Sequence, residues 1–213
     1  MDIVTAQTFF VKELIPFFRE WGFEYIDAYS QFRKTDKMGF QSVILSISKY
    51  EDEIWIEVTL AIRKNEVEQI AQKFLSNLSD FQHHTTTIAI SLGKLNQNPY
   101  FRYKAENEED LEVCAEELIK FMSEEGMNFL EEKNYLKELN LLFNKTPKHP
   151  ILYVHNQFHR YFKGIVLAKI TNYDKYDELV ELYFRSLIYQ KANETIQANF
   201  KRLTHFLVHY SVN

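Results

Sequence analysis

The chain has 213 residues, a formal net charge of −5, and a composition that is 46% hydrophobic and 15% aromatic. Disordered chains lack such a content of apolar and aromatic residues, so the sequence predicts a folded protein of one or two domains. A single cysteine, Cys114, excludes an intrachain disulfide and favours a reducing compartment. The N-terminal residues are acidic rather than basic, and no apolar run reaches the roughly 20 residues of a membrane span. We therefore expect a soluble protein of the cytoplasm.

The first expected helix covers residues 6–21, where six large apolar residues recur at helical spacing. Pro16 removes one backbone hydrogen bond inside this segment and predicts a kink or a shortened helix. From residue 25 to residue 92 the apolar residues alternate with a period of two, which is the pattern of strands with one buried face. Strands are expected at residues 25–33, 40–48, 54–62 and 85–92, with a short edge strand at 100–103 and a helix at 64–77. Short polar turns between the first three strands predict an antiparallel meander.

After residue 107 the apolar residues recur every three or four positions, which is the pattern of helices. Asn107 is a good N-cap, and the three acidic residues that follow it suit the positive end of a helix dipole. Helices are expected at residues 107–126, 128–143, 151–170, 174–190 and 193–210, with a linker at 146–150. Asp174 and Asn193 are the expected caps of the last two helices.

These patterns together predict an α+β protein. A three- to four-stranded antiparallel sheet is packed with helices and is followed by an all-helical C-terminal half. The expected organisation is a sheet domain over residues 1–104 and a helical region over residues 105–213 docked on it. A single continuous domain is the alternative.

Several common reaction centres are missing from the sequence. The five glycines, Gly22, Gly39, Gly93, Gly126 and Gly164, are scattered, which excludes a Walker loop and a dinucleotide-binding fingerprint. There is no G-x-S-x-G nucleophile elbow, and one cysteine cannot form a Cys-pair zinc site.

Histidine spacing is the best candidate for chemistry. His155 with His159, and His205 with His209, are two i, i+4 pairs, and such spacing on a helix places both imidazoles on one face. Two helices that each offer a pair could hold a divalent zinc, iron or manganese ion. Asn156 stands where the zincin motif requires a glutamate, so that motif's general base is missing. Surface or interface histidines are the alternative interpretation.

The outer face of the strand at 54–62 is the candidate for partner binding. Trp55, Glu57 and Arg63 alternate with the apolar residues of this strand, and Tyr29 lies on the neighbouring one. Trp, Tyr and Arg dominate the energetic hot spots of protein interfaces, so this face suits a protein partner. The alternative is that the C-terminal helices cover it.

Charge is distributed unevenly along the chain. Residues 1–144 carry 15 Lys and Arg against 25 Asp and Glu, whereas residues 145–213 carry 10 against 5. The basic, aromatic C-terminal third could bind phosphates and stack on bases, which makes nucleic-acid binding a further hypothesis. The lysines are spread out and the whole chain is acidic, so this footprint is weak.

Residues Phe17–Phe23, followed by Tyr29–Arg33 and Val43–Ile47, resemble a family of bacterial domains of unknown function. Those domains open with a helix, a Gly-Phe pair and an antiparallel meander, and the resemblance covers residues 1–100. It implies a small bacterial α+β module and brings no catalytic residues and no cofactor.

We therefore expect a non-enzymatic protein-interaction or binding module, immunity-like or regulatory, with an unidentified protein partner or a second copy of the chain. A metal-binding protein or metal-dependent hydrolase built on the histidine pairs is the alternative, and a nucleic-acid binder is the third hypothesis.

Overall fold

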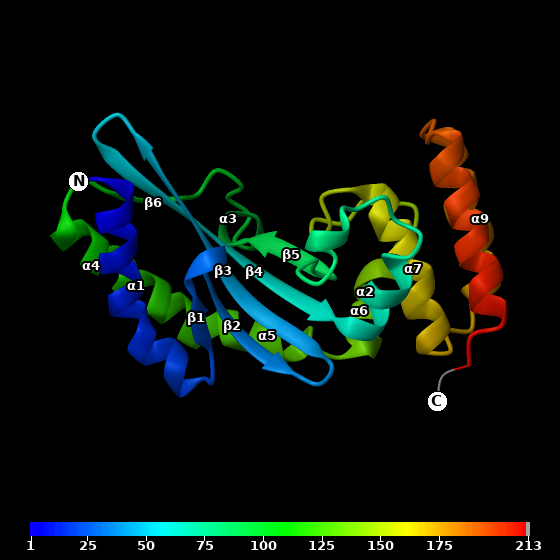
Figure 1. Ribbon diagram of the computed structural model, residues 1–213, viewed down its shortest axis with the longest axis horizontal. Coiled ribbons are helices and arrows are strands. Elements are labelled where there is room, and N and C mark those ends of the chain that lie inside the picture. The colour runs from blue at the N-terminus through cyan, green and yellow to red at the C-terminus, as the bar shows by residue number, and fades with distance from the viewer. Residues whose placement is uncertain (212–213) are drawn as a thin grey trace. The chain divides into compact units, whose positions relative to one another are not determined.

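The computed structural model describes residues 1–211 and confirms the α+β class. The antiparallel sheet has the strand order β1-β2-β3-β4-β5, and a further strand, β6, also pairs with β4 (Figure 1). The strands are β1 (Glu24–Ile26), β2 (Gln31–Asp36), β3 (Gly39–Tyr50), β4 (Glu53–Lys64), β5 (Ile88–Ser91) and β6 (Tyr103–Ala105). The sheet therefore has six strands, one more than the four strands and the edge strand expected.

The extra strand comes from a turn inside one expected strand, and the bounds of the edge strand also differ from the prediction. The expected strand at 25–33 is divided into β1 and β2 by a 3-10 turn (Asp27–Tyr29) and by Ser30, whose φ is 46°. This turn reverses the chain, so Tyr25 pairs with Phe32 in an antiparallel ladder. The edge strand expected at 100–103 begins instead at Tyr103. The two-residue period of the aromatic segment 25–33 therefore does not reveal the turn within it.

The residues group into two compact units, each made of separate stretches of chain. The first unit comprises Met1–Ile62 and Ala89–Glu132, and the second comprises Arg63–Ile88 and Lys133–Asn213. A domain boundary between residues 104 and 105 is expected from the sequence. That boundary concerns regions that fold separately, which the two compact units do not test, so it stays a prediction.

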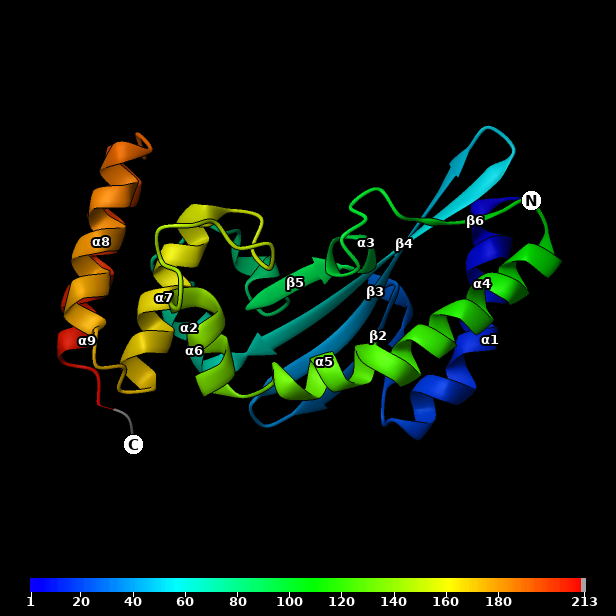
Figure 2. The same cartoon turned by 180° about the vertical axis from the view of Figure 1, so that it is seen from behind.

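In the first unit, helices pack on one face of the sheet. They are α1 (Ile3–Glu20), α3 (Leu92–Leu95), α4 (Glu108–Phe121) and α5 (Met127–Glu132), and a π-helical turn (Met122–Gly126) joins α4 to α5. Figure 2 shows α1 and α4 side by side, and these two helices contact each other. Phe18 of α1 stacks on Phe32 of β2 with ring centroids 4.2 Å apart. This face of the sheet is the core of the first unit.

In the second unit, α7 lies at the centre of a helical cluster. Its helices are α2 (Asn65–Ala71), α6 (Leu136–Asn144), α7 (Gln157–Ile170), α8 (Tyr176–Tyr189) and α9 (Glu194–Val208). Helix α7 contacts α2, α6, α8 and α9, and ten of its fourteen residues are buried. No helix within residues 1–211 has both the length and the apolar character needed to cross a membrane.

The helix caps expected at Asn107 and Asn193 are confirmed, because each side chain accepts a backbone N–H bond three residues on. The cap expected at Asp174 is wrong, because α8 begins at Tyr176 with Lys175 at the N-cap position and has no side-chain cap. Most helical bounds differ from the prediction by a few residues, and three differ by more. The helix expected at 64–77 ends at Ala71, the one expected at 128–143 is interrupted between Glu132 and Leu136, and the one expected at 151–170 begins only at Gln157. Asn156 caps that late start by accepting the Phe158 N–H.

Candidate functional site: an aromatic cluster on the sheet and a buried polar network

Strand β4 places its odd-numbered residues on the sheet face opposite to its apolar core side. Ile54, Ile56 and Val58 are buried, whereas Trp55 and Glu57 between them are partly exposed. This is the alternation that the sequence predicts for a half-buried strand. Antiparallel pairing with β6 sets Lys104 directly opposite Trp55.

The Trp55 ring is flanked by an aromatic ring and two cations. Tyr50, at the end of β3, lies with its ring centroid 4.8 Å from that of Trp55, and 56% of Tyr50 is exposed. The Arg102 guanidinium lies 5.4 Å from the Trp55 ring, and the Lys104 ammonium lies 4.8 Å from it. Cations at these distances are attracted to the ring face. We call these four residues, with Glu53 and Glu57, the Trp55 cluster.

Two carboxylates hold the cluster in place. The Trp55 Nε1–H donates to Glu53 Oε2 at 2.8 Å, and Lys104 Nζ donates to the same oxygen at 3.1 Å. These two hydrogen bonds, that from Trp55 first, lower the pKa of the Glu53 carboxyl. Arg102 Nε lies 3.6 Å from Glu57 Oε2. The cluster thus presents a Trp, a Tyr and an Arg in a fixed arrangement, with its charges balanced.

The other two residues predicted for partner binding lie elsewhere. Tyr29 is exposed in the turn before β2, and β3 separates β2 from β4 in the sheet. Arg63 is only 4% exposed, so it is not part of an exposed face. Alternation along β4 predicts the side of the sheet to which Arg63 points, but it does not reveal that this end of the strand is enclosed.

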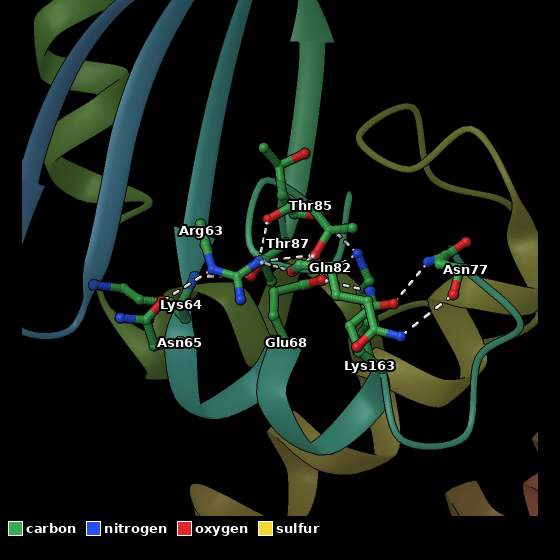
Figure 3. A network of polar contacts seen from close by, with 11 residues as sticks. Arg63, Lys64, Asn65, Glu68, Asn77, Gln82, Thr85, Thr87 and Lys163 are labelled. Carbon is green, nitrogen blue, oxygen red and sulfur yellow. Dashed lines mark hydrogen bonds and ion pairs between the residues drawn. The ribbon is translucent and has the colours of Figure 1, made fainter. Parts of the chain in front are cut away.

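Arg63 belongs instead to a buried polar network in the second unit (Figure 3). Its Nη1 donates to the carbonyl oxygens of Gln82 and Thr85 at 2.9 and 2.6 Å, and its Nε donates to Asn65 Oδ1 at 2.9 Å. The next backbone N–H, that of Lys64, donates to Thr87 Oγ1. Burial lowers the pKa of the Arg63 guanidinium. The end of β4 therefore supplies the donors that the carbonyls of residues 82–85 need.

An ion pair between Glu68 of α2 and Lys163 of α7 is the second part of the network. Lys163 Nζ lies 2.9 Å from Glu68 Oε1 and donates to the Thr86 carbonyl at 2.6 Å. Gln72 Nε2 donates to the other carboxylate oxygen of Glu68 at 3.0 Å. Burial by itself would raise the pKa of Glu68, but the Lys163 ammonium and the hydrogen bonds hold it below its ordinary value.

This network explains how the irregular segment between α2 and β5 is held. Buried backbone carbonyls require hydrogen-bond donors, and here the side chains of Arg63 and Lys163 donate to them. Glu68 is 0% exposed and Lys163 is 5% exposed, so the pair has no open face toward a substrate. We interpret the network as structural.

Sequence reasoning missed this pair, although one signal was available. Lys163 is the one charged residue in the run Tyr161–Ala168, all of which is buried. A lysine in a helical segment that is apolar on every side requires an anionic partner or a route to water. That signal predicts a partner for Lys163 but does not identify it.

The two predicted histidine pairs differ in whether their side chains lie close together. His155 precedes α7 and is exposed, so it does not share a helical face with His159. His159 is partly buried on α7, and burial, followed by the nearby charge of Lys163, lowers its pKa. His205 lies on α9 and His209 is the C-cap residue of that helix, and their ring centroids are 5.3 Å apart. Within residues 1–211 no three His, Cys, Asp or Glu side chains are placed to hold a metal ion, so the predicted metal site has no support from this geometry.

Comparison of the chain with protein-family models, with curated proteins and with solved structures finds no match.

Proposed function

We propose that the protein is a non-enzymatic binding module that recognises a protein partner through the Trp55 cluster. The observation that carries this proposal is the Trp55 ring held between Tyr50, Arg102 and Lys104 on the outer face of the sheet. Trp, Tyr and Arg are the residue types enriched in interface hot spots.

The cluster is also ordered before a partner arrives. Glu53 accepts from both Trp55 and Lys104, so the ring and the ammonium already occupy defined positions. An interface that is ordered in the free protein loses less conformational entropy on binding, and Trp and Tyr supply large contact areas with few rotatable bonds. Neighbouring charges of both signs suit a partner with a complementary polar rim.

Site-specific photo-crosslinking in the native cell tests the proposal. A benzophenone side chain replaces Tyr50 in one variant and Tyr189, an 88% exposed tyrosine at the end of α8, in a control variant. We expect a discrete adduct from position 50 that is absent from position 189 and is lost when Trp55→Ala is added.

Circular dichroism and thermal unfolding establish that each variant is folded, and sedimentation velocity shows whether the adduct contains a second copy of this chain. An adduct at position 50 that survives Trp55→Ala, or equal labelling from both positions, would contradict the proposal.

A further inference from the structure

The histidine pair at the end of α9 has the spacing of a metal chelate. His205 and His209 are both exposed, and their ring centroids are 5.3 Å apart. Four residues make slightly more than one helical turn, so the two imidazoles project from the same side of the helix. Because both rings are exposed, an ion can reach them from water without any opening of the core.

The separation of the two rings matches that of two imidazoles bound to one zinc ion. A zinc–nitrogen bond is about 2.0–2.1 Å long, so a ligating imidazole has its ring centre about 3.2 Å from the ion. Two such rings at the tetrahedral angle have their centres about 5.2 Å apart. The centroids of His205 and His209 are 5.3 Å apart. The helix backbone therefore does not have to move for one nitrogen of each ring to reach a common ion.

The electrostatic surroundings also favour a cation at this place. His209 is the C-cap residue of α9, where the last backbone carbonyls form the negative end of the helix dipole. Two basic residues earlier in the helix direct their charges to other side chains. The Lys201 ammonium lies 4.8 Å from the Phe184 ring, and Arg202 Nη1 lies 3.5 Å from Asn199 Oδ1.

We propose that His205 and His209 together bind one divalent transition-metal ion, for which zinc is the reference. Imidazole nitrogen is a good ligand for zinc and copper, whereas magnesium and calcium prefer oxygen. In the part of the chain that the structure describes, no third His, Cys, Asp or Glu side chain joins the pair. The ion therefore keeps its other coordination positions for water, and the site is smaller than the four-histidine site expected from the sequence.

The two histidines act as one chelate rather than as two separate ligands. Once one imidazole holds the ion, the helix keeps the other imidazole within reach, so the second bond forms within one molecule at a high effective concentration. Removal of either ring leaves a single imidazole, and the chelate is lost. A chelate therefore predicts that the effects of removing the two rings are not additive.

Calorimetric titration of the full chain, without a histidine tag, with zinc chloride tests the proposal. We expect saturable binding of one zinc ion per chain, with copper(II) at least as tight and magnesium without measurable binding. His205→Ala and His209→Ala should each weaken zinc binding at least about tenfold. The double variant should bind zinc only slightly more weakly than either single variant, because one substitution already removes the chelate.

His155→Ala is the control, because it removes one exposed histidine that precedes α7 and leaves the pair intact. It should leave the zinc affinity unchanged. Circular dichroism verifies that each variant is folded. Equal weakening in the His155→Ala control, or single losses that add up in the double variant, would overturn the proposal. The absence of saturable zinc binding to the folded wild type would also overturn it, and none of these outcomes bears on the Trp55 cluster.

Discussion

The Glu68–Lys163 pair allows a quantitative prediction about stability. At the observed 2.9 Å between Nζ and Oε1, two unit charges attract by about 6 kcal/mol at an effective dielectric constant of about 20. The loss of hydration by both buried groups offsets most of this attraction. Lys163→Met would leave the Glu68 carboxylate enclosed without a cation, and we expect the free energy of unfolding to fall by about 3–5 kcal/mol. That is a large share of the roughly 5–15 kcal/mol that stabilises a typical domain.

Urea unfolding of Lys163→Met, Glu68→Gln and the double variant measures the coupling between the two side chains. The double variant leaves neither charge unpaired. Its loss of unfolding free energy should therefore be smaller than the sum of the two single losses by at least about 2 kcal/mol. The exposed Arg185–Glu181 pair, 3.2 Å apart on α8, is the matched control and should show a coupling below about 0.5 kcal/mol. Equal coupling in the two cycles would refute the reasoning.

The pH dependence of stability supplies a second check on the same pair. The folded state holds the pKa of Glu68 below its ordinary 4.5, so the unfolded chain binds a proton more readily. The resulting stabilisation is fully present above about pH 4.5 and is lost as the pH falls through the lowered, folded-state pKa. Wild-type protein should therefore lose stability more steeply than Glu68→Gln on acidification below pH 4.5. If the two proteins lost the same unfolding free energy as the pH fell below 4.5, Glu68 would not be held ionised by its partners.

Three further substitutions test the packing of the second unit. Asn193→Ala removes the side chain that accepts the Ile196 N–H and should lower the free energy of unfolding, measured in urea, by about 1 kcal/mol. Asn193→Ser keeps an acceptor at the N-cap and should retain most of the wild-type stability. Gly164→Ala places a Cβ 2.9 Å from Asn144 Oδ1 and 3.0 Å from the Tyr183 ring, so a loss of about 1–3 kcal/mol and a lower Tm are expected; an unchanged Tm would contradict this close approach. Tyr183→Phe removes the hydroxyl that donates to Asn144 Oδ1 at 2.6 Å and should cost about 1–2 kcal/mol. Burial raises the pKa of Tyr183 to about 12, so ultraviolet titration of the variant should lose one late-ionising tyrosine.

Much of the fold follows from patterns within a few residues. The two-residue period of β4 and the spacing of Phe10, Leu14 and Phe18 on α1 each predict an element and its buried side. The caps at Asn107 and Asn193 are equally local, because the hydrogen bond that defines each one spans three residues. Turns inside apolar segments are harder to predict, since an aromatic run such as residues 25–33 satisfies a strand pattern whether or not the chain reverses within it.

The sites depended more heavily on tertiary structure. The sequence by itself placed Trp55 and Glu57 on one side of a strand, and it placed His205 and His209 on one face of a helix. Only the packing of α2, α7 and residues 82–87 decided that Arg63 is enclosed and that Lys163 meets Glu68. Backbone periodicity determines where a side chain points along its own element. Whether that direction leads to water or to an opposite charge depends on which distant segments pack there, and that depends on the free energy of the whole chain.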